Sequence, residues 1–343
     1  MATPPIAVRN TGLVTSVGLS APASCAAFRA KITNPSETRF HDSKGKWIMA
    51  HEVPLEKPWR GLTKLVQMAS MAIIEALAGI PKAEWTDLPL LLCVAEPDRP
   101  GRVAGLDDTL FLQIQSELGV RFSTSSAIVA QGRVGVAVAV AQARALMNKS
   151  ACPRVLIVAV DSLVSWPTLS HYEQRDRLLT ESNSNGFMPG EAAGALLVSE
   201  PSGAAGELLC VGLGFAREPA HIESDLPLRG DGLSQAIRLA LADAGQQMHV
   251  MDFRIADLSG EQYYFKEASL ALSRTLRVLK EEFDIWHPAE CTGEIGAAAG
   301  ASILCAAKAA SDKRYGKGSN VLVHLANDAG QRAAMVLHMQ GVA

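Results

Sequence analysis

The sequence predicts a large α/β protein built from two similar halves. The chain has 343 residues, of which 48% are hydrophobic and 20% are charged, values typical of a folded protein with an extensive core. Short apolar runs of strand length alternate with longer segments of helical periodicity. The order of strands and helices in residues 1–200 recurs in residues 201–343, which indicates an internal duplication divided between these two ranges.

Periodicity and turn residues predict the elements of the first half. Apolar residues recur every three or four positions over 62–77, which predicts a helix with one buried face. Residues 88–95 are almost continuously apolar and precede a turn-rich segment, as expected of a buried strand. Residues 34–58 are polar and lack a sustained period, so we expect an irregular surface segment. The other expected elements are a strand and a glycine turn within 6–18, a helix at about 21–31, a strand at 120–129, a helix at 132–147 and a strand at 154–160.

The second half follows the same alternation. Its expected elements are a strand at 208–212, a helix at 233–244, a strand at 253–258, helices at 267–279 and 296–310, and strands at 321–325 and 333–339. In the first half, residues 132–147 combine small and branched side chains, which suits a helix buried between two sheets.

Composition excludes several classes of function. The net charge is −3 and no block of basic residues stands out, so neither nucleic acid nor an anionic membrane is an expected partner. Apolar runs fall far short of the ~20 residues that span a bilayer. Residues 1–5 lack the basic and apolar regions of a secretion signal, so we expect a cytoplasmic protein. Six cysteines occur without a C-x-x-C pair or a histidine at ligand spacing, and we expect no metal or other cofactor.

The segment 183–200 joins a polar, glycine-containing turn to small residues and then to an apolar run. This pattern predicts a tight loop that leads into a closely packed, buried strand. The segment closely resembles the G-F-x-x-G-E-G/A-A-G-A loop and strand of β-ketoacyl synthases, the condensing enzymes of the thiolase superfamily. Residues 8–18 resemble the opening of the same family, V-x-T-G-x-G-x-V-S-x-x-G. The resemblance implies a thiolase-like, five-layered α-β-α-β-α fold of two duplicated halves, with two sheets around buried helices.

The resemblance also implies where a condensing enzyme carries its cysteine and two histidines. The family's C-x-x-G pattern, which follows the strand that pairs across the dimer, matches Val129 at the cysteine. The first histidine, in N-A-H-G-T-G-T, matches Ser259, and the second, in K-S-x-x-G-H-x-x-G-A-A-G, matches Glu294. Condensation needs a thiolate and groups that stabilise developing negative charge. Because the three matched residues supply neither a thiolate nor an imidazole, we expect a degenerate protein without condensing activity.

The remnant of that active site is expected to contain Glu261, Cys291, Arg133 and Phe187 beside Glu294. Two close carboxylates, Glu261 and Glu294, would form an acid/base pair if no cation neutralised them. The preferred interpretation is that they bind helix N-termini or an arginine such as Arg133.

A displaced nucleophile is another alternative. Ser125, Ser126 or Cys291 would attack a substrate, with His287 as the base. Serines more often cap or stabilise turns, and cysteines more often pack as small buried side chains, so we expect these structural roles instead.

These losses predict a protein that acts by binding or assembly. The resemblance implies a homodimer or a heterodimer with a homologue, as in chain-length-factor subunits, which lack the nucleophile. It also implies a protein partner, either a carrier protein or a secreted effector, because short degenerate proteins of this kind resemble accessory products of bacterial type VI secretion effector clusters. The competing hypothesis is an enzyme, namely an acyltransferase or hydrolase that acts on acyl thioesters with non-standard residues.

Overall fold

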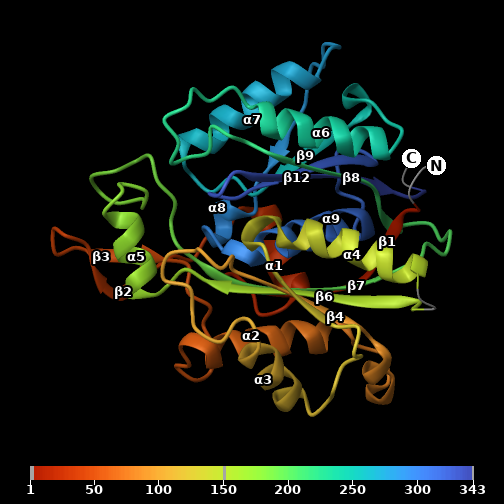
Figure 1. Ribbon diagram of the computed structural model, residues 1–343, viewed down its shortest axis with the longest axis horizontal. Coiled ribbons are helices and arrows are strands. Elements are labelled where there is room, and N and C mark those ends of the chain that lie inside the picture. Colours follow the sequence, from red (N-terminus) through yellow and green to blue (C-terminus); the bar gives the residue numbers. More distant parts are fainter. Residues whose placement is uncertain (1–3, 150–151, 342–343) are drawn as a thin grey trace.

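The computed structural model describes residues 4–149 and 152–341 (Figure 1). Residues 1–3 lie outside the described residues. They are part of the segment 1–5, for which the sequence predicts no secretion signal. Ten strands form one sheet in the order β10-β9-β11-β12-β8-β1-β7-β6-β4-β5, and β2 and β3 form a separate hairpin. Strand β1 (Ile6–Val14) pairs with β7 (Glu191–Ser199) and, through its first residues, with β8 (Leu208–Arg217). It therefore connects the sheets of the two halves.

Three parallel strands and their helices build the first half. Strands β5 and β6 flank β4, and β7 closes this half antiparallel to β6. The bounds are α1 Ala21–Ala30, α2 Gly61–Ala76, η1 Lys82–Asp87, β4 Leu90–Val94, α3 Thr109–Leu118, β5 Ala127–Ala130, η2 Gly132–Val134, α4 Gly135–Lys149, β6 Arg154–Ser162 and α5 Trp166–Glu173.

The second half repeats this plan. Strands β10 and β11 flank β9 in parallel, and β12 is antiparallel to β11. The bounds are α6 Asp231–Asp243, η3 Met248–Val250, β9 Phe253–Ala256, α7 Gln262–Thr275, β10 Ile285–Trp286, α8 Ala289–Thr292, η4 Gly296–Ala298, α9 Ala299–Asp312, β11 Asn320–Ala326 and β12 Gln331–Met339. Outward from the β1–β8 contact, the sheet order is β7, β6, β4, β5 on one side and β12, β11, β9, β10 on the other. This symmetry confirms the predicted duplication.

Five layers result, as Figure 1 shows. Helices α1, α4 and α9 lie between the two parts of the sheet, α6 and α7 cover one outer face, and α2 and α3 cover the other. The main hydrophobic core surrounds α4 and α9, and a further cluster fills the space under each outer pair of helices. The predicted fold class is therefore confirmed. Among the described residues, the helices are too short or too polar to cross a membrane.

The strand expected at 120–129 is shorter than predicted. Only β5 is a strand, because Ser126 holds the preceding residues in a turn. Its hydroxyl accepts from the backbone N–H of Leu90 at 2.9 Å and donates to the carbonyl of Ser123 at 2.6 Å. Side-chain bonding of this kind competes with a strand ladder.

The irregular segment expected at 34–58 contains a hairpin. Strands β2 (Ser36–His41) and β3 (Trp47–Ala50) pair antiparallel. The Asp42 carboxylate fixes the turn between them by accepting from two backbone N–H groups, those of residues 44 and 46. Most β2 side chains face solvent, which is why a polar composition concealed these strands.

Two equivalent glycines start the buried helices. Gly132 (φ +52°) precedes α4 and Gly296 (φ +54°) precedes α9, and both adopt the left-handed conformation that favours glycine. A Cβ at Gly132 would collide with the Glu96 carboxylate, and one at Gly296 with the Asp161 carboxylate. These turns let the starts of the two helices come together at the junction of the halves.

A close contact between β1 and α2 provides a test of the packing. A Cβ on Gly12 would collide with the backbone carbonyl oxygen of Ala72, which cannot rotate away. We expect Gly12→Ala to lower the free energy of unfolding by about 1–3 kcal/mol, the usual cost of overpacking. Denaturant titration measures it, with Gly316→Ala, whose Cβ would make only ordinary contacts, as the control. Equal stability of the two variants would contradict this packing.

Candidate functional site

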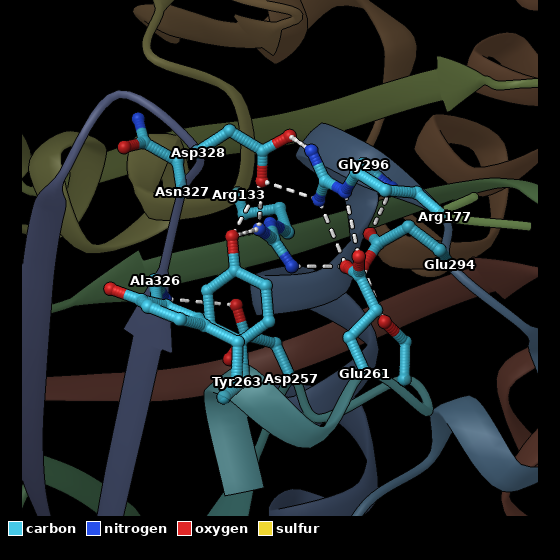
Figure 2. A network of polar contacts seen from close by, with 12 residues as sticks. Arg133, Arg177, Asp257, Glu261, Tyr263, Glu294, Gly296, Ala326, Asn327 and Asp328 are labelled. Carbon is cyan, nitrogen blue, oxygen red and sulfur yellow. Dashed lines mark hydrogen bonds and ion pairs between the residues drawn. The ribbon is translucent and has the colours of Figure 1, made fainter. Parts of the chain in front are cut away.

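A buried cluster of charges occupies the junction of the two halves. Figure 2 shows two arginines, Arg133 from η2 and Arg177 from the loop after α5, between Asp328 on one side and Glu261 and Glu294 on the other. Both arginines and both glutamates are less than a tenth exposed. We call these five residues the junction network.

Arg133 contacts three elements of the second half. Its guanidinium donates to Glu294 Oε2 at 3.0 Å, to the Tyr264 hydroxyl at 2.6 Å and to Asp328 Oδ1 at 2.7 Å. The guanidinium also lies over the Tyr264 ring, with its carbon 4.5 Å from the ring centroid. Planar donors and an aromatic face are the combination that suits arginine in a buried ion pair.

Arg177 forms a paired contact with Glu261. Its Nε and Nη2 donate to the two carboxylate oxygens of Glu261 at 2.6 and 2.9 Å, and its Nη1 donates to Asp328 Oδ2 at 2.7 Å. The guanidinium packs over the rings of Tyr172 and Phe187, at 4.9 and 5.9 Å from their centroids. Asp328, in the turn from β11 to β12, thus bridges the two arginines.

Main-chain contacts position Glu294. The backbone N–H of Glu294 donates to the carbonyl of Met188, and the carbonyl of Glu294 accepts from the N–H of Gly190. Both partners belong to the loop of the 183–200 motif. The carboxylate accepts from the backbone N–H of Gly296 at 2.9 Å and from the Ser259 hydroxyl at 2.8 Å. Glu294 therefore neutralises both Arg133 and the start of η4, which is the preferred interpretation of its role.

Burial and the arginines have opposing effects on the acids. For Asp328, burial opposes ionisation, but Arg133 and Arg177 outweigh it and hold the pKa well below its usual range. For Glu261, burial outweighs Arg177 and raises the pKa. Burial raises the pKa of nearby Asp257 to about 7, because Arg133 compensates only in part.

The junction network nearly fills the space between the residues that compose it. A cavity of about 20 Å³ remains, lined by all five network residues and by Phe187. This volume is enough for about one water molecule. An acyl chain therefore has no room here, and of the described residues that line the cavity none is a cysteine or a histidine.

The structure brings together most of the residues predicted for the remnant pocket. Arg133, Phe187, Glu261 and Glu294 surround the cavity, and Ser259 bonds to Glu294. Cys291 was wrongly placed there. It lies in α8, on the side that faces α1, where its Sγ is 3.9 Å from the Ala27 carbonyl oxygen, and it lines a different cavity.

Val129 does not stand at a helix start. It lies within β5, is 3% exposed and packs in the main core. The residue at the strand-to-helix junction, where a helix N-terminus would activate a nucleophile, is Gln131. Its amide oxygen accepts from Gln331 at 2.7 Å. A carboxamide is no more a nucleophile than valine is, so the expected loss of the thiolate is unchanged by this correction.

The alternative nucleophiles have structural surroundings. Ser126 is engaged in the turn before β5, and Ser125 lies in the same turn, where its backbone N–H donates to the Ser123 hydroxyl at 3.3 Å. Burial raises the pKa of Cys291 to about 11, so its thiol is protonated. Burial also lowers the pKa of His287, whose Nδ1 faces Glu290 at 2.6 Å. These residues do not form an activated pair.

Sequence reasoning missed Arg177 and the bridging role of Asp328. One signal was available, because two buried glutamates and a single arginine would leave a net negative charge in the core. A second cation was therefore required. The sequence does not show which of the 32 lysines and arginines supplies it, because Arg177 lies in an irregular loop.

Solved structures share this fold over almost the whole chain. The ishigamide ketosynthase/chain length factor has a TM-score of 0.80 at 18% identity, covering 99% of this chain and 100% of that chain. AntDE:AntF, a type II PKS acyl-carrier protein in complex with its ketosynthase bound to the hexaketide, has a TM-score of 0.80 at 16% identity, covering 98% and 99%. The ketosynthase ApeO in complex with its chain length factor ApeC, from Xenorhabdus doucetiae, has a TM-score of 0.72 at 13% identity, covering 98% of each chain. No family model and no curated protein matches the sequence. The chain has the thiolase-like fold of ketosynthases and chain length factors.

The Arg133–Glu294 pair should be strongly coupled. Arg133→Met leaves Glu294 buried without its cation, while Asp328 keeps Arg177. We expect it to lower the free energy of unfolding by about 3–5 kcal/mol. Adding Glu294→Gln should recover part of this loss, so that the double variant is more stable than the sum of the single effects predicts. Denaturant titrations of the four proteins measure the coupling, with the exposed Arg121→Met as control. Additive effects would mean that the two residues do not stabilise each other.

Asp257 should make stability depend on pH. Its carboxylate accepts from the backbone N–H of Ala326 at 2.9 Å, a bond that an asparagine oxygen can replace. Because the folded-state pKa is raised to about 7, the folded protein holds a proton that the unfolded chain releases. Wild-type stability should therefore fall relative to Asp257→Asn as pH rises from about 4 to about 7.5, by up to about 4 kcal/mol. Denaturation at both pH values measures the difference, and parallel profiles would show that Asp257 ionises normally in the fold.

Proposed function

We propose that this protein is a ketosynthase-like subunit without condensing activity that acts by binding a partner protein. The observation that carries the proposal is the junction network, which includes Glu294 and Arg133 from segments that the resemblance assigns to the active site. Packing five charged groups together, four of them buried, leaves neither the space nor the reactive side chains that the chemistry needs. The competing hypothesis, an acyltransferase or hydrolase, has no nucleophile at this centre to support it.

A cationic groove on the first half supports a protein partner. It has a volume of about 500 Å³ and runs between the segment after β3 and the start of α5. Arg39, Lys57 and Arg60 line it, and none lies within ion-pair distance of a carboxylate in the part of the chain that the structure describes. Its two carboxylates are Glu191, which pairs with Lys64, and Glu52, which Arg39 and Arg60 influence at longer range, so the lining keeps an excess of positive charge. Aromatic side chains accompany them, with Arg39 over the Phe40 ring and Lys57 over the Trp59 ring. Unpaired cations beside apolar surface suit an acidic protein.

An acyl carrier protein is the partner that we favour for this groove. One similar structure is a ketosynthase in complex with an acyl-carrier protein, and the charge of the groove supports the same kind of contact here. An effector of a bacterial type VI secretion system is a more distant proposal, which rests on the resemblance in size and in lost residues.

The edge of the sheet supports a second subunit. Within the described residues, β5 pairs with β4 alone, so one of its sides presents unpaired backbone groups. Two of the similar structures are ketosynthase and chain length factor pairs. We therefore propose a homodimer, or a heterodimer with a homologous ketosynthase, that forms across this strand.

The experiment measures chemistry and binding on the same preparation. The protein is incubated with octanoyl-acyl carrier protein and malonyl-coenzyme A, and intact mass spectrometry follows acylation of the protein and formation of product. We expect neither, while calorimetry detects binding of the carrier. Arg39→Glu combined with Arg60→Glu should weaken this binding by at least about tenfold, a loss of about 1.4 kcal/mol. Arg121→Glu combined with Arg238→Glu makes the same change of net charge at two exposed positions outside the groove and is the control.

The outcomes separate the hypotheses. An acylated protein or a β-ketoacyl product would overturn the loss of activity and favour the enzyme. Equal carrier affinity of the groove variant and the control would show that the groove is not the docking surface. Sedimentation at micromolar concentration tests the β5 interface, and a monomer both alone and with a homologous ketosynthase would contradict it.

A further inference from the structure

A second cavity lies away from the junction network, between α1, β10 and the end of α9. Its volume is about 300 Å³, and its walls include Phe28, Ile255, Trp286, Cys291 and Tyr315. We call it the α1–β10 cavity. Its volume is at the lower end of the range found for small-molecule sites, and it shares no lining residue with the junction network.

Aromatic rings form much of its surface. The Trp286 ring packs 4.5 Å from the ring of Phe253 and 6.2 Å from that of Tyr315, nearly parallel to the latter at 24°. This packing holds Trp286 in place while leaving it on the cavity wall with half-buried Phe28. Rigid rings on two sides of a space favour a flat, apolar guest, because aromatic groups gain stabilisation from stacking beyond their buried area.

The charged side chains that line the cavity include one cation, Arg29, that no carboxylate of the described residues neutralises. Glu290 forms an ion pair with Lys31 at 3.3 Å, and its other carboxylate oxygen faces His287. Burial lowers the pKa of His287, so its ring is neutral at physiological pH. Arg29 lies over the Tyr315 ring, 4.6 Å from its centroid, and forms no ion pair within the described residues. The rim therefore carries one uncompensated positive charge next to an apolar interior.

We propose that the α1–β10 cavity binds a small aromatic carboxylate, with its ring against Trp286 and Phe28 and its carboxylate on Arg29. Arginine presents paired donors that match a carboxylate. The volume accepts one substituted ring with a short side chain. Binding is non-covalent, since the Cys291 thiol in the wall is protonated. This site does not depend on the proposed function.

Calorimetry with 4-phenylbutyrate tests the proposal, with 4-phenylbutyramide and hexanoate as matched probes. The full-length protein should bind phenylbutyrate, and the neutral amide and the aliphatic acid should each bind at least about tenfold more weakly. Arg29→Gln should weaken phenylbutyrate binding to the level of the amide. Arg29 is exposed, so this variant keeps the fold, and Arg121→Gln is the charge-matched control.

A variant that fills the cavity provides a second test of binding. Ala306, on α9, lines the cavity and is 6% exposed, so Ala306→Phe places a ring in the space. Binding should be lost in this variant at an unchanged melting temperature. If Ala306→Phe does not fold, the Arg29→Gln comparison decides alone. Absence of phenylbutyrate binding, equal affinity for Arg29→Gln and wild type, or equal affinity for hexanoate would each overturn the proposal.

Discussion

The contact of Arg133 with Glu294 and Asp328 is the interaction on which the rest of the site depends. Arg133 starts one buried helix, and its two carboxylate partners come from the other half of the chain. Charges inside a protein are costly unless each has a partner with good geometry. Arg177 is then required as well, because Asp328 and Glu261 would otherwise leave excess negative charge. The network therefore fixes the position of four loops at once.

This network is what supports the proposed loss of condensing activity. A condensing centre needs space for an acyl chain and unpaired reactive groups, and both lower stability. Here the space is reduced to about 20 Å³ and the polar groups are paired. In the proposed function, binding takes place at the surface instead, at the cationic groove and at the open edge of β5. The α1–β10 cavity is separate from both and keeps its aromatic walls.

The duplication gives the junction its geometry. Gly132 and Gly296 adopt nearly the same backbone conformation, and each packs against a carboxylate on a neighbouring strand or loop. Asp161, beside Gly296, accepts from the backbone N–H of Ala297 at 2.9 Å and is paired with Arg99 at 2.7 Å. The same turn in each half thus brings the start of its buried helix to the centre, where the two halves exchange charged contacts.

The sequence by itself determined the fold class, the order of nearly all the core elements and the presence of Arg133, Glu261 and Glu294 at one site. Hydrophobic periodicity predicted the helices and strands because it is a local pattern. The five-layered fold and the shared site were expected from the resemblance to β-ketoacyl synthases. Only the tertiary structure decided the partners. Arg177 lies in a loop without a period, Gln131 rather than Val129 begins the helix, and Cys291 faces α1 although it is three residues from Glu294. The direction of a side chain depends on the phase of a short turn, and the pairing of buried charges depends on segments distant in the sequence, so neither is recorded in a local pattern.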